Sequence, residues 1–294
     1  MTTESTQKVR TTGNSAKAWA PDLQEFLPSD VIPDALIFEA ATVVTEQLDG
    51  DGPVARIPWV NDAEAAFVAE GAEIEQSEPE LAEVVVATGK ISQLIPISRE
   101  QWEQDHAARL LSESVARAVT KKANQAFISQ VAPEQGAITP PEGILTQAAI
   151  THAEGITIDL DPLAFMLAAI EEEGGNPNLI IANPTAWAQL RNMKIGEGSN
   201  ASLLGAGTQD ADKRLLGLPV HTSPAVPAGG LLVVDKTAIA AAVGPLQVAN
   251  SEHVYFSSDR IALRATWRIG WKVAHPKRLG FLSVVADDDS ATEG

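Results

Sequence analysis

The most regular pattern in the chain lies at residues 260–273, which read RIALRATWRIGWKV. Every second position from Ile261 to Val273 is apolar, and the alternate positions from 260 to 272 include four basic residues: Arg260, Arg264, Arg268 and Lys272. Basic residues every four positions could indicate a helix. A helix, however, would scatter the apolar residues around its circumference, whereas a strand collects them on one face. We therefore predict a long strand with one apolar face and one basic face.

The residues before this strand, 156–245, favour a compact α/β lobe in which short helices and strands alternate. Asp161 and Pro162 are typical of a helix start, and Gly174-Gly175 closes that helix. The short apolar runs between helices are typical of buried strands. The expected elements are helices at 161–170 and 184–192, and strands at 179–182, 218–222 and 231–234.

A long helix is predicted to begin at Ser98. Ser98 and Gln101 form a capping box, in which each side chain can satisfy a free backbone N–H of the first turn. Apolar residues then recur at helical spacing, and neither Gly nor Pro interrupts the pattern before Pro133. At ~1.5 Å per residue, a helix of this length would be roughly 50 Å long. Such a spine helix suits an extended subunit better than a compact globule.

Residues 54–97 predict a long, projecting β-hairpin. Both ends are rich in β-branched residues, and Pro58 marks the first strand as an edge strand. The middle of the segment holds too few large apolar residues for a core of its own. No Lys or Arg occurs between Arg56 and Lys90, while the acidic residues in that interval include Glu70, Glu73, Glu75, Glu78 and Glu80. The simplest interpretation is a solvated acidic arm, and the alternative is an arm that docks on a basic surface of another subunit.

Composition sets limits on the function. An apolar fraction of 45% and a charged fraction of 20% are typical of a folded protein. The formal net charge of −18 does not favour binding to the phosphates of nucleic acid, which needs a concentrated positive surface. The chain has no cysteine and no apolar run long enough to span a membrane, so we expect no disulfides and no membrane partner.

Motifs of enzymes are not found. The five histidines show no metal-ligand spacing, and the sequence contains no P-loop, no Gly-x-Ser-x-Gly elbow and no His-Glu-x-x-His motif. We therefore predict no catalytic residue, no metal ligand, no cofactor and no enzymatic activity.

Several stretches, taken together and in order, resemble the major capsid proteins of tailed bacteriophages with the Hong Kong 97-like fold. They are Phe-Val-Ala-Glu-Gly at 67–71, Ser77-x-Pro79, Ile-Pro-Ile-Ser-Arg-Glu at 95–100, NPTAWAQLR at 183–191, RLLGLPVHTSPAVPAG at 214–229 and DRIALRATWRIGWKVAHPKRLGFLSV at 259–284. Each match is short, but they follow the family's order and cover residues 30 to 286.

The resemblance implies an α+β fold with an N-terminal arm, an extended hairpin loop, a peripheral lobe with a spine helix and a long strand, and an α/β axial lobe. The corresponding divisions are 1–34 for the arm, 35–97 for the arm end and hairpin loop, 98–155 for the peripheral domain with its spine helix, 156–249 for the axial domain, 250–286 for the return to the peripheral domain (with the last strand in the axial domain as an alternative) and 287–294 for a disordered tail.

The resemblance also implies a role in the virion. Subunits would form pentamers and hexamers that close into an icosahedral shell around double-stranded DNA, which is enclosed without sequence-specific binding. Assembly would take place in the host cytoplasm, with a portal protein and, where needed, a decoration protein as partners. Because the resemblance starts near residue 30, we expect any scaffold to be a separate protein. Some family members cross-link a loop lysine to an asparagine, but this loop has no lysine before Lys90, so we expect no such bond.

The charges suggest how subunits would meet. We expect the hairpin glutamates of one subunit to contact the basic face at Arg260, Arg264, Arg268 and Lys272 of another. The alternative is that these basic residues pair within their own subunit. Two rival functions stay open at this point: an encapsulin, which is a bacterial compartment of the same fold that loads a cargo enzyme, and an unrelated enzyme with a diffuse site.

Overall fold

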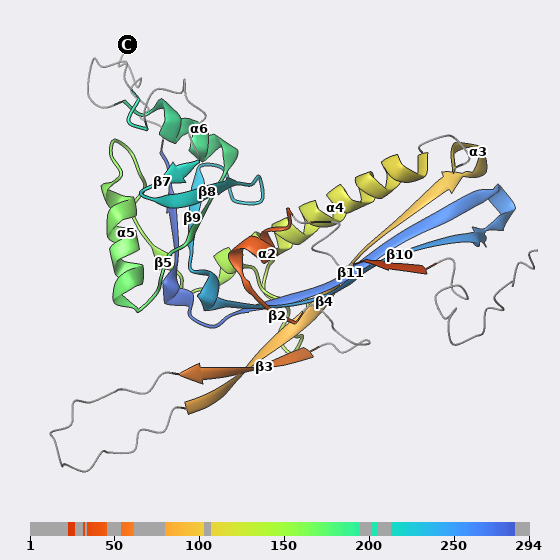
Figure 1. Ribbon diagram of the computed structural model, residues 1–294, viewed down its shortest axis with the longest axis horizontal. Coiled ribbons are helices and arrows are strands. Elements are labelled where there is room, and N and C mark those ends of the chain that lie inside the picture. The colour runs from red at the N-terminus through yellow and green to blue at the C-terminus, as the bar shows by residue number, and fades with distance from the viewer. Residues whose placement is uncertain are drawn as a thin grey trace, which may run out of the picture.

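The computed structural model describes residues 23–26, 32, 34–45, 54–61, 80–102, 107–194, 202–204 and 213–285. It has two lobes, each built on a six-stranded sheet. A long, narrow lobe contains a twisted antiparallel sheet with a helix along it, and a compact lobe of sheet and short helices stands at one end (Figure 1). The arrangement is an α+β fold, as the sequence predicted.

The long sheet is built around two extended antiparallel strands, β10 (Ile239–Tyr255) and β11 (Arg260–Val273). Its order is β1 (Leu23–Phe26), β10, β11, β4 (Glu80–Ser98) and β3 (Val54–Asn61), and β2 (Thr42–Thr45) pairs in parallel with β10. Strand β11 confirms the prediction for residues 260–273. Strand β10 was not predicted as one element, and it crosses the division drawn at residues 249 and 250.

The apolar face of β11 forms the centre of the long lobe. All seven apolar residues from Ile261 to Val273 are buried, and Trp267 is fully enclosed. Helix α4 (Ala107–Ser129) lies over this face and contributes Val115, Val119 and Phe127 to the same core. The ring of Phe127 meets Trp271 edge to face, with 5.3 Å between centroids. Alternation along the strand therefore decides which side of the sheet the helix covers.

The segment predicted as one spine helix forms two described helices, α3 (Arg99–Trp102) and α4, on either side of residues 103–106, which lie outside the described residues. The Ser98 side chain accepts a hydrogen bond from the Gln101 backbone N–H at 3.3 Å, which is one of the two hydrogen bonds of the predicted capping box. Helix α4 has 23 residues and spans about 34 Å. Residues 36–45 form helix α2 (Leu36–Ala40) followed by strand β2, because the β-branched residues 42–45 favour a strand.

The predicted hairpin is present as the antiparallel pair of β3 and β4, with Pro58 in the edge strand. The part of the hairpin around Ile57 and Ala87, which we call its root, crosses the face of β11 that is opposite to α4. A Cβ atom at Gly270 would collide with the carbonyl oxygen of Ala87, so only glycine allows the two backbones this close. Beside it, Ile57 and Val86 are buried against the small residues Ala240 and Ala242. Small side chains on the sheet thus make room for the hairpin to lie across it.

The compact lobe has the sheet order β5 (Thr151–His152), β12 (Leu279–Ser283), β9 (Gly230–Val234), β6 (Leu179–Ala182), β8 (Leu218–Thr222) and β7 (Arg214–Leu215). Helices α5 (Asp161–Glu172) and α6 (Pro184–Asn192) share one apolar cluster with the sheet. The other side of the sheet, with Ile181, Leu232 and Val234, joins the core of the long lobe. The helices and strands predicted for this region are confirmed.

The chain passes between the lobes near Asp235. This residue is almost fully buried; its carboxylate accepts hydrogen bonds from the backbone N–H groups of Thr237 and Asn176 and from the Thr237 hydroxyl. On the partly exposed surface between the lobes, Nδ1 of His221 lies 2.8 Å from a carboxylate oxygen of Glu39. The described residues also include four short 3-10 helices: η3 (Ile144–Thr146), η4 (Lys236–Ala238), η5 (Phe256–Ser258) and η6 (Pro276–Arg278).

Some predictions fall on residues outside the described ranges. They include most of the arm at 1–34 and the tail at 287–294. The division into peripheral and axial domains stays a prediction. In the described part of the chain, no helix is both long enough and apolar enough to cross a membrane.

Candidate subunit-interaction surface

Four basic side chains project from one face of β11, on the side away from α4. We call Arg260, Arg264, Arg268 and Lys272 the basic row. Arg260, Arg264 and Lys272 are exposed, whereas Arg268 is half-buried. The residues between them on this face, Ala262, Thr266 and Gly270, are buried. The predicted basic face is therefore a row of cations that alternate with small, buried residues along the strand.

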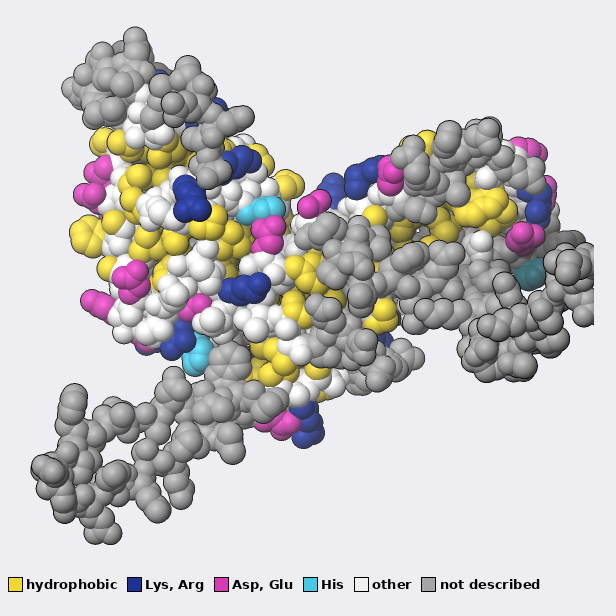
Figure 2. Space-filling view, viewed as in Figure 1, with side chains coloured by type: hydrophobic (Ala, Val, Ile, Leu, Met, Phe, Trp, Pro, Cys, Tyr) yellow, Lys and Arg dark blue, Asp and Glu magenta, His cyan; other side chains and the backbone are white. Residues whose placement is uncertain are grey.

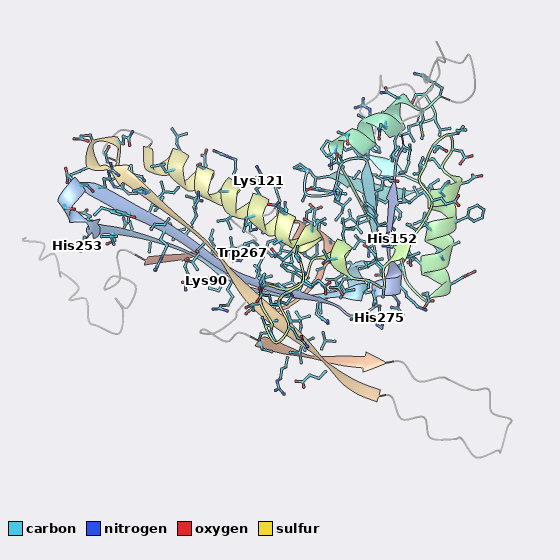
Figure 3. The ribbon with its side chains drawn as sticks, turned by 180° about the vertical axis from the view of Figure 1, so that it is seen from behind. Lys90, Lys121, His152, His253, Trp267 and His275 are labelled. Carbon is cyan, nitrogen blue, oxygen red and sulfur yellow. The ribbon has the colours of Figure 1, made fainter. Side chains whose placement is uncertain are left out.

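Strand β4 adds two residues to this surface that the sequence did not assign to it. Residues directly opposite each other in antiparallel strands share a face. Lys90 lies opposite Arg268, and Leu94 lies opposite Arg264. Leu94 is 52% exposed, which places an apolar side chain beside the basic row. Figure 3 shows Lys90 on the opposite side of the sheet from Lys121 of α4, with Trp267 between them. These two residues could be placed beside the basic row only from the register between β4 and β11.

One member of the basic row, Arg268, has a described contact within the subunit. A guanidinium nitrogen of Arg268 donates a hydrogen bond to the Thr88 hydroxyl at 3.3 Å, so this side chain is held at the hairpin root. Arg260, Arg264 and Lys272 make no ion pair with any other residue that the structure describes. No described residue neutralises these three cations, so they are available to a partner subunit.

At the far end of the long sheet, charges are already paired. Nε of Arg99 lies 3.0 Å from a carboxylate oxygen of Asp259, and its guanidinium also reaches Glu252 at 3.5 Å. The hydrogen bond and charge of Asp259, with the charge of Glu252, raise the pKa of Arg99 above its ordinary value. The end of the sheet near Arg260 is thus closer to neutral than the part around Arg264 and Lys272.

The acidic half of the predicted contact lies largely outside the described residues. This applies to Glu70, Glu73, Glu75 and Glu78, while Glu80 is the first residue of β4, opposite Asn61. Lower on the hairpin, Glu83 pairs with Arg56 at 3.4 Å, and both side chains are mostly exposed. The contact between these glutamates and the basic row therefore stays a prediction.

We next consider whether the described residues could form a metal site or an acid–base pair. No group of three or more His, Cys, Asp or Glu side chains among them is placed to bind a metal ion. A cleft of about 540 Å³ lies between α4 and residues 223–225 of the compact lobe, and its described lining includes Arg117, Lys121, Asn124 and Asp34. The described lining provides no histidine and no carboxylate pair that could act as a general acid and base.

Comparison with known proteins shows one family. The model described as "Phage capsid family" matches residues 20–284, which is most of the chain. No curated protein sequence matches significantly.

Solved structures share the fold at low sequence identity. The structure titled "Capsid of empty GTA particle computed with C5 symmetry" aligns with a TM-score of 0.64 and 17% identity, over 86% of this chain and 90% of that one. A structure from Gordonia phage Cozz gives 0.65 and 18%, over 86% and 87%. One from Microbacterium phage Oxtober96 gives 0.65 and 14%, over 94% and 99%. At these identities the similarity shows the fold, and it confirms the predicted Hong Kong 97-like fold.

Proposed function

The chain belongs to the phage capsid family and is a major capsid protein, and from this premise we propose that its copies form pentamers and hexamers that close into an icosahedral shell around the double-stranded DNA of a tailed phage. The observation that carries the proposal is the match of one capsid family model to residues 20–284, a range that includes both lobes and the hairpin. The protein would reside in the virion after assembly in the host cytoplasm.

The hairpin is the part of the subunit that we propose reaches a neighbour. Its glutamates would lie on the basic row of an adjacent subunit, around Arg264, Arg268 and Lys272. Exposed ion pairs contribute only about 0–1 kcal/mol each, so such contacts would set register and approach, while apolar burial repeated over many copies holds the shell. Leu94 beside Arg264 offers an apolar element at the same place.

The test of shell formation is direct. The full chain is expressed with and without a scaffold protein encoded beside it, and examined by size-exclusion chromatography and negative-stain electron microscopy. Closed megadalton shells, or free pentamers and hexamers, are the expected result. A chain that stays monomeric even with the scaffold protein present contradicts the proposal.

A charge reversal tests the hairpin contact. Arg264→Glu places a negative charge beneath the glutamates of the neighbour and is expected to impair assembly, because like charges then face each other. A second reversal in the hairpin, Glu75→Arg, is expected to restore part of the yield. Lys121→Glu is the matched control, since Lys121 is an exposed cation on the helix side of the sheet. Normal assembly of the single Arg264 variant would remove the main support for the contact.

The contents of the particle distinguish a phage capsid from an encapsulin. The encapsulin alternative is not favoured, because the matching family model is that of phage capsids. We propose a genome and not a cargo enzyme as the contents, with a portal protein as a partner and separate scaffolding and decoration proteins where assembly needs them. Nuclease-resistant DNA in particles recovered from infected cells is expected, and a co-purifying enzyme in its place would contradict the assignment.

A further inference from the structure

Two segments of the chain pass side by side between the lobes, at one corner of the molecule. Residues 235–238 lead from β9 of the compact lobe to β10 of the long sheet, and residues 274–278 lead from β11 back to β12. We call these two segments the corner. They are joined by hydrogen bonds, since the backbone N–H groups of Ala274 and His275 both donate to the Ala238 carbonyl, at 2.8 and 3.3 Å. Contacts within the corner therefore help to set the angle between the lobes.

His275 places an ionisable ring in the corner. Figure 3 shows it at the lower end of the compact lobe, beside the end of the long sheet. The residue is half-buried, and its backbone carbonyl accepts a hydrogen bond from the N–H of Arg278 at 3.1 Å. Figure 2 shows basic and acidic side chains together with a histidine at the lower end of the compact lobe. The charge of the His275 ring therefore acts on both segments of the corner.

The nearby carboxylate and guanidinium are already held by other groups. Asp235 is almost fully buried, and its carboxylate accepts hydrogen bonds from the backbone N–H and hydroxyl of Thr237 and from the N–H of Asn176. Nε of Arg278 donates to the Glu173 carbonyl at 3.2 Å, which keeps the guanidinium at the corner. A proton added to the histidine ring would therefore meet a fixed positive charge, while the carboxylate is committed to backbone donors.

Further ionisable side chains around the corner have partners of their own. Nζ of Lys236 donates to the Phe38 carbonyl at 3.0 Å, and Lys277 pairs with the Glu173 carboxylate at 2.8 Å. His152 of β5 packs edge to face against the phenylalanine of β12, with 6.0 Å between ring centroids. The described contacts therefore offer the ring in the corner no uncommitted carboxylate.

These surroundings favour the neutral form of the ring. Burial and the positive charge of Arg278 lower the pKa of His275 below its ordinary value of 6.5, and the negative charge of Asp235 opposes this only in part. The unfolded chain therefore binds this proton more readily than the folded chain does. The stability that the neutral ring contributes is fully present above about pH 6.5, and it is lost as the pH falls below that value toward the pKa of the folded state. Acid thus acts against the contacts of the corner.

The two lobes share an apolar core that does not depend on this proton. Ile181, Leu232 and Val234 of the compact sheet belong to the same cluster as Phe127 and Trp267 of the long lobe. Burial of apolar surface does not change when a group outside the cluster ionises, so both lobes stay folded. Local opening of a few hydrogen bonds costs less free energy than global unfolding. Acid is therefore expected to act on the corner before it acts on the rest of the subunit.

We propose that the corner is a proton-sensitive joint: when His275 gains a proton, the hydrogen bonds between residues 235–238 and 274–278 open locally, and the angle between the lobes becomes variable while each lobe stays folded. The protonated ring leaves its place beside Arg278 for water, and the Ala238 carbonyl loses its two donors. The inference concerns the single subunit, so it stands or falls independently of shell formation.

Hydrogen–deuterium exchange on the unassembled full chain tests the joint. Exchange is compared at about pH 7.5 and about pH 5.5, on either side of the ordinary histidine pKa, and is corrected for the intrinsic effect of pH on amide exchange. In the wild type, peptides that contain Ala238 and Ala274 are expected to lose protection severalfold at the lower pH, while β6 keeps its protection. His275→Gln stays neutral at both pH values, so in this variant the same peptides are expected to remain protected.

Two further variants complete the comparison. His253→Gln removes an exposed histidine at the far end of the long sheet (Figure 3) and is expected to behave as the wild type. His275→Lys carries a charge at both pH values and is expected to lack protection in the corner at neutral pH as well. Wild-type protection that does not change with pH, or that falls equally in His275→Gln, would overturn the inference.

A distance measurement tests the angle between the lobes. The chain has no cysteine, so Lys121→Cys on α4 and Ala168→Cys on α5 introduce one exposed site for a spin label in each lobe. The distribution of distances between the two labels is expected to broaden at about pH 5.5 in the wild-type background and to stay narrow when His275→Gln is added. Equal distributions at both pH values in the wild-type background would show that the joint does not open.

Discussion

At the scale of single residues, alternation along β11 was enough to predict which side chains enter the core, and all seven were found buried. The partners of their polar atoms were not predictable. The indole N–H of Trp267 donates to the Gly244 carbonyl at 3.0 Å, at an irregularity in the pairing of β10 next to Pro245. Pro245 has no N–H to donate to β11, so β10 bulges at this position. The Gly244 carbonyl is then available to Trp267.

Removal of the buried Asp235 carboxylate is expected to lower the free energy of unfolding. In Asp235→Ala, the backbone N–H groups of Thr237 and Asn176 lose their acceptor at the passage between the lobes. We expect the free energy of unfolding to fall by about 1–3 kcal/mol, measured by urea unfolding of the unassembled subunit. Glu134→Ala, which removes an exposed carboxylate, is the control and should change it by less than about 0.5 kcal/mol. Equal effects of both variants would show that the carboxylate is not structural.

At the scale of elements, the helices and strands of the compact lobe and the hairpin at 54–97 were predicted from short apolar runs, β-branched residues and caps. Strand β10 was not. Its first part is rich in alanine and contains Gly244 and Pro245, which do not favour a strand. Pairing with β11 along most of its length outweighs that local preference. The crossing of the hairpin root over the sheet was also hidden, because it depends on contacts between residues far apart in sequence.

The crossing makes a specific demand on Gly270. In Gly270→Ala the new methyl group would meet the Ala87 carbonyl, so β4 must move away from β11. We expect a loss of about 1–3 kcal/mol in the free energy of unfolding, as for overpacking of a core. Gly89→Ala is the matched control on the neighbouring strand, where the nearest atom is a proline side-chain carbon at 3.3 Å. If both substitutions had the same small effect in a thermal unfolding experiment, the close crossing would be refuted.

At the scale of the whole molecule, the order of segments along the chain predicted an extended lobe with a long helix and a separate α/β lobe, and this arrangement is present (Figure 1). The sequence allowed one prediction about the contact between subunits, which is that the acidic hairpin meets the basic row. The structure adds that three of the row's cations make no ion pair with the described residues, and that Lys90 and Leu94 border them.

The shell is expected to be held without covalent links between subunits. The hairpin has no lysine between Arg56 and Lys90, and Lys90 lies at its base on the sheet. Particles boiled in denaturant should therefore migrate as a single band of about 31.0 kDa on a gel. A ladder of covalent oligomers that persists under these conditions would disprove this expectation.

The most direct test of the account is an electron cryomicroscopy reconstruction of the assembled particle, with attention to the density above β11. The account predicts that the hairpin residues 62–79 of one subunit lie on the basic row of the next, within ion-pairing distance of Arg264 and Lys272. A shell in which this face is occupied by another segment, or is open to solvent, would contradict the proposed contact. Particles without a repeating shell of this subunit would contradict the function itself.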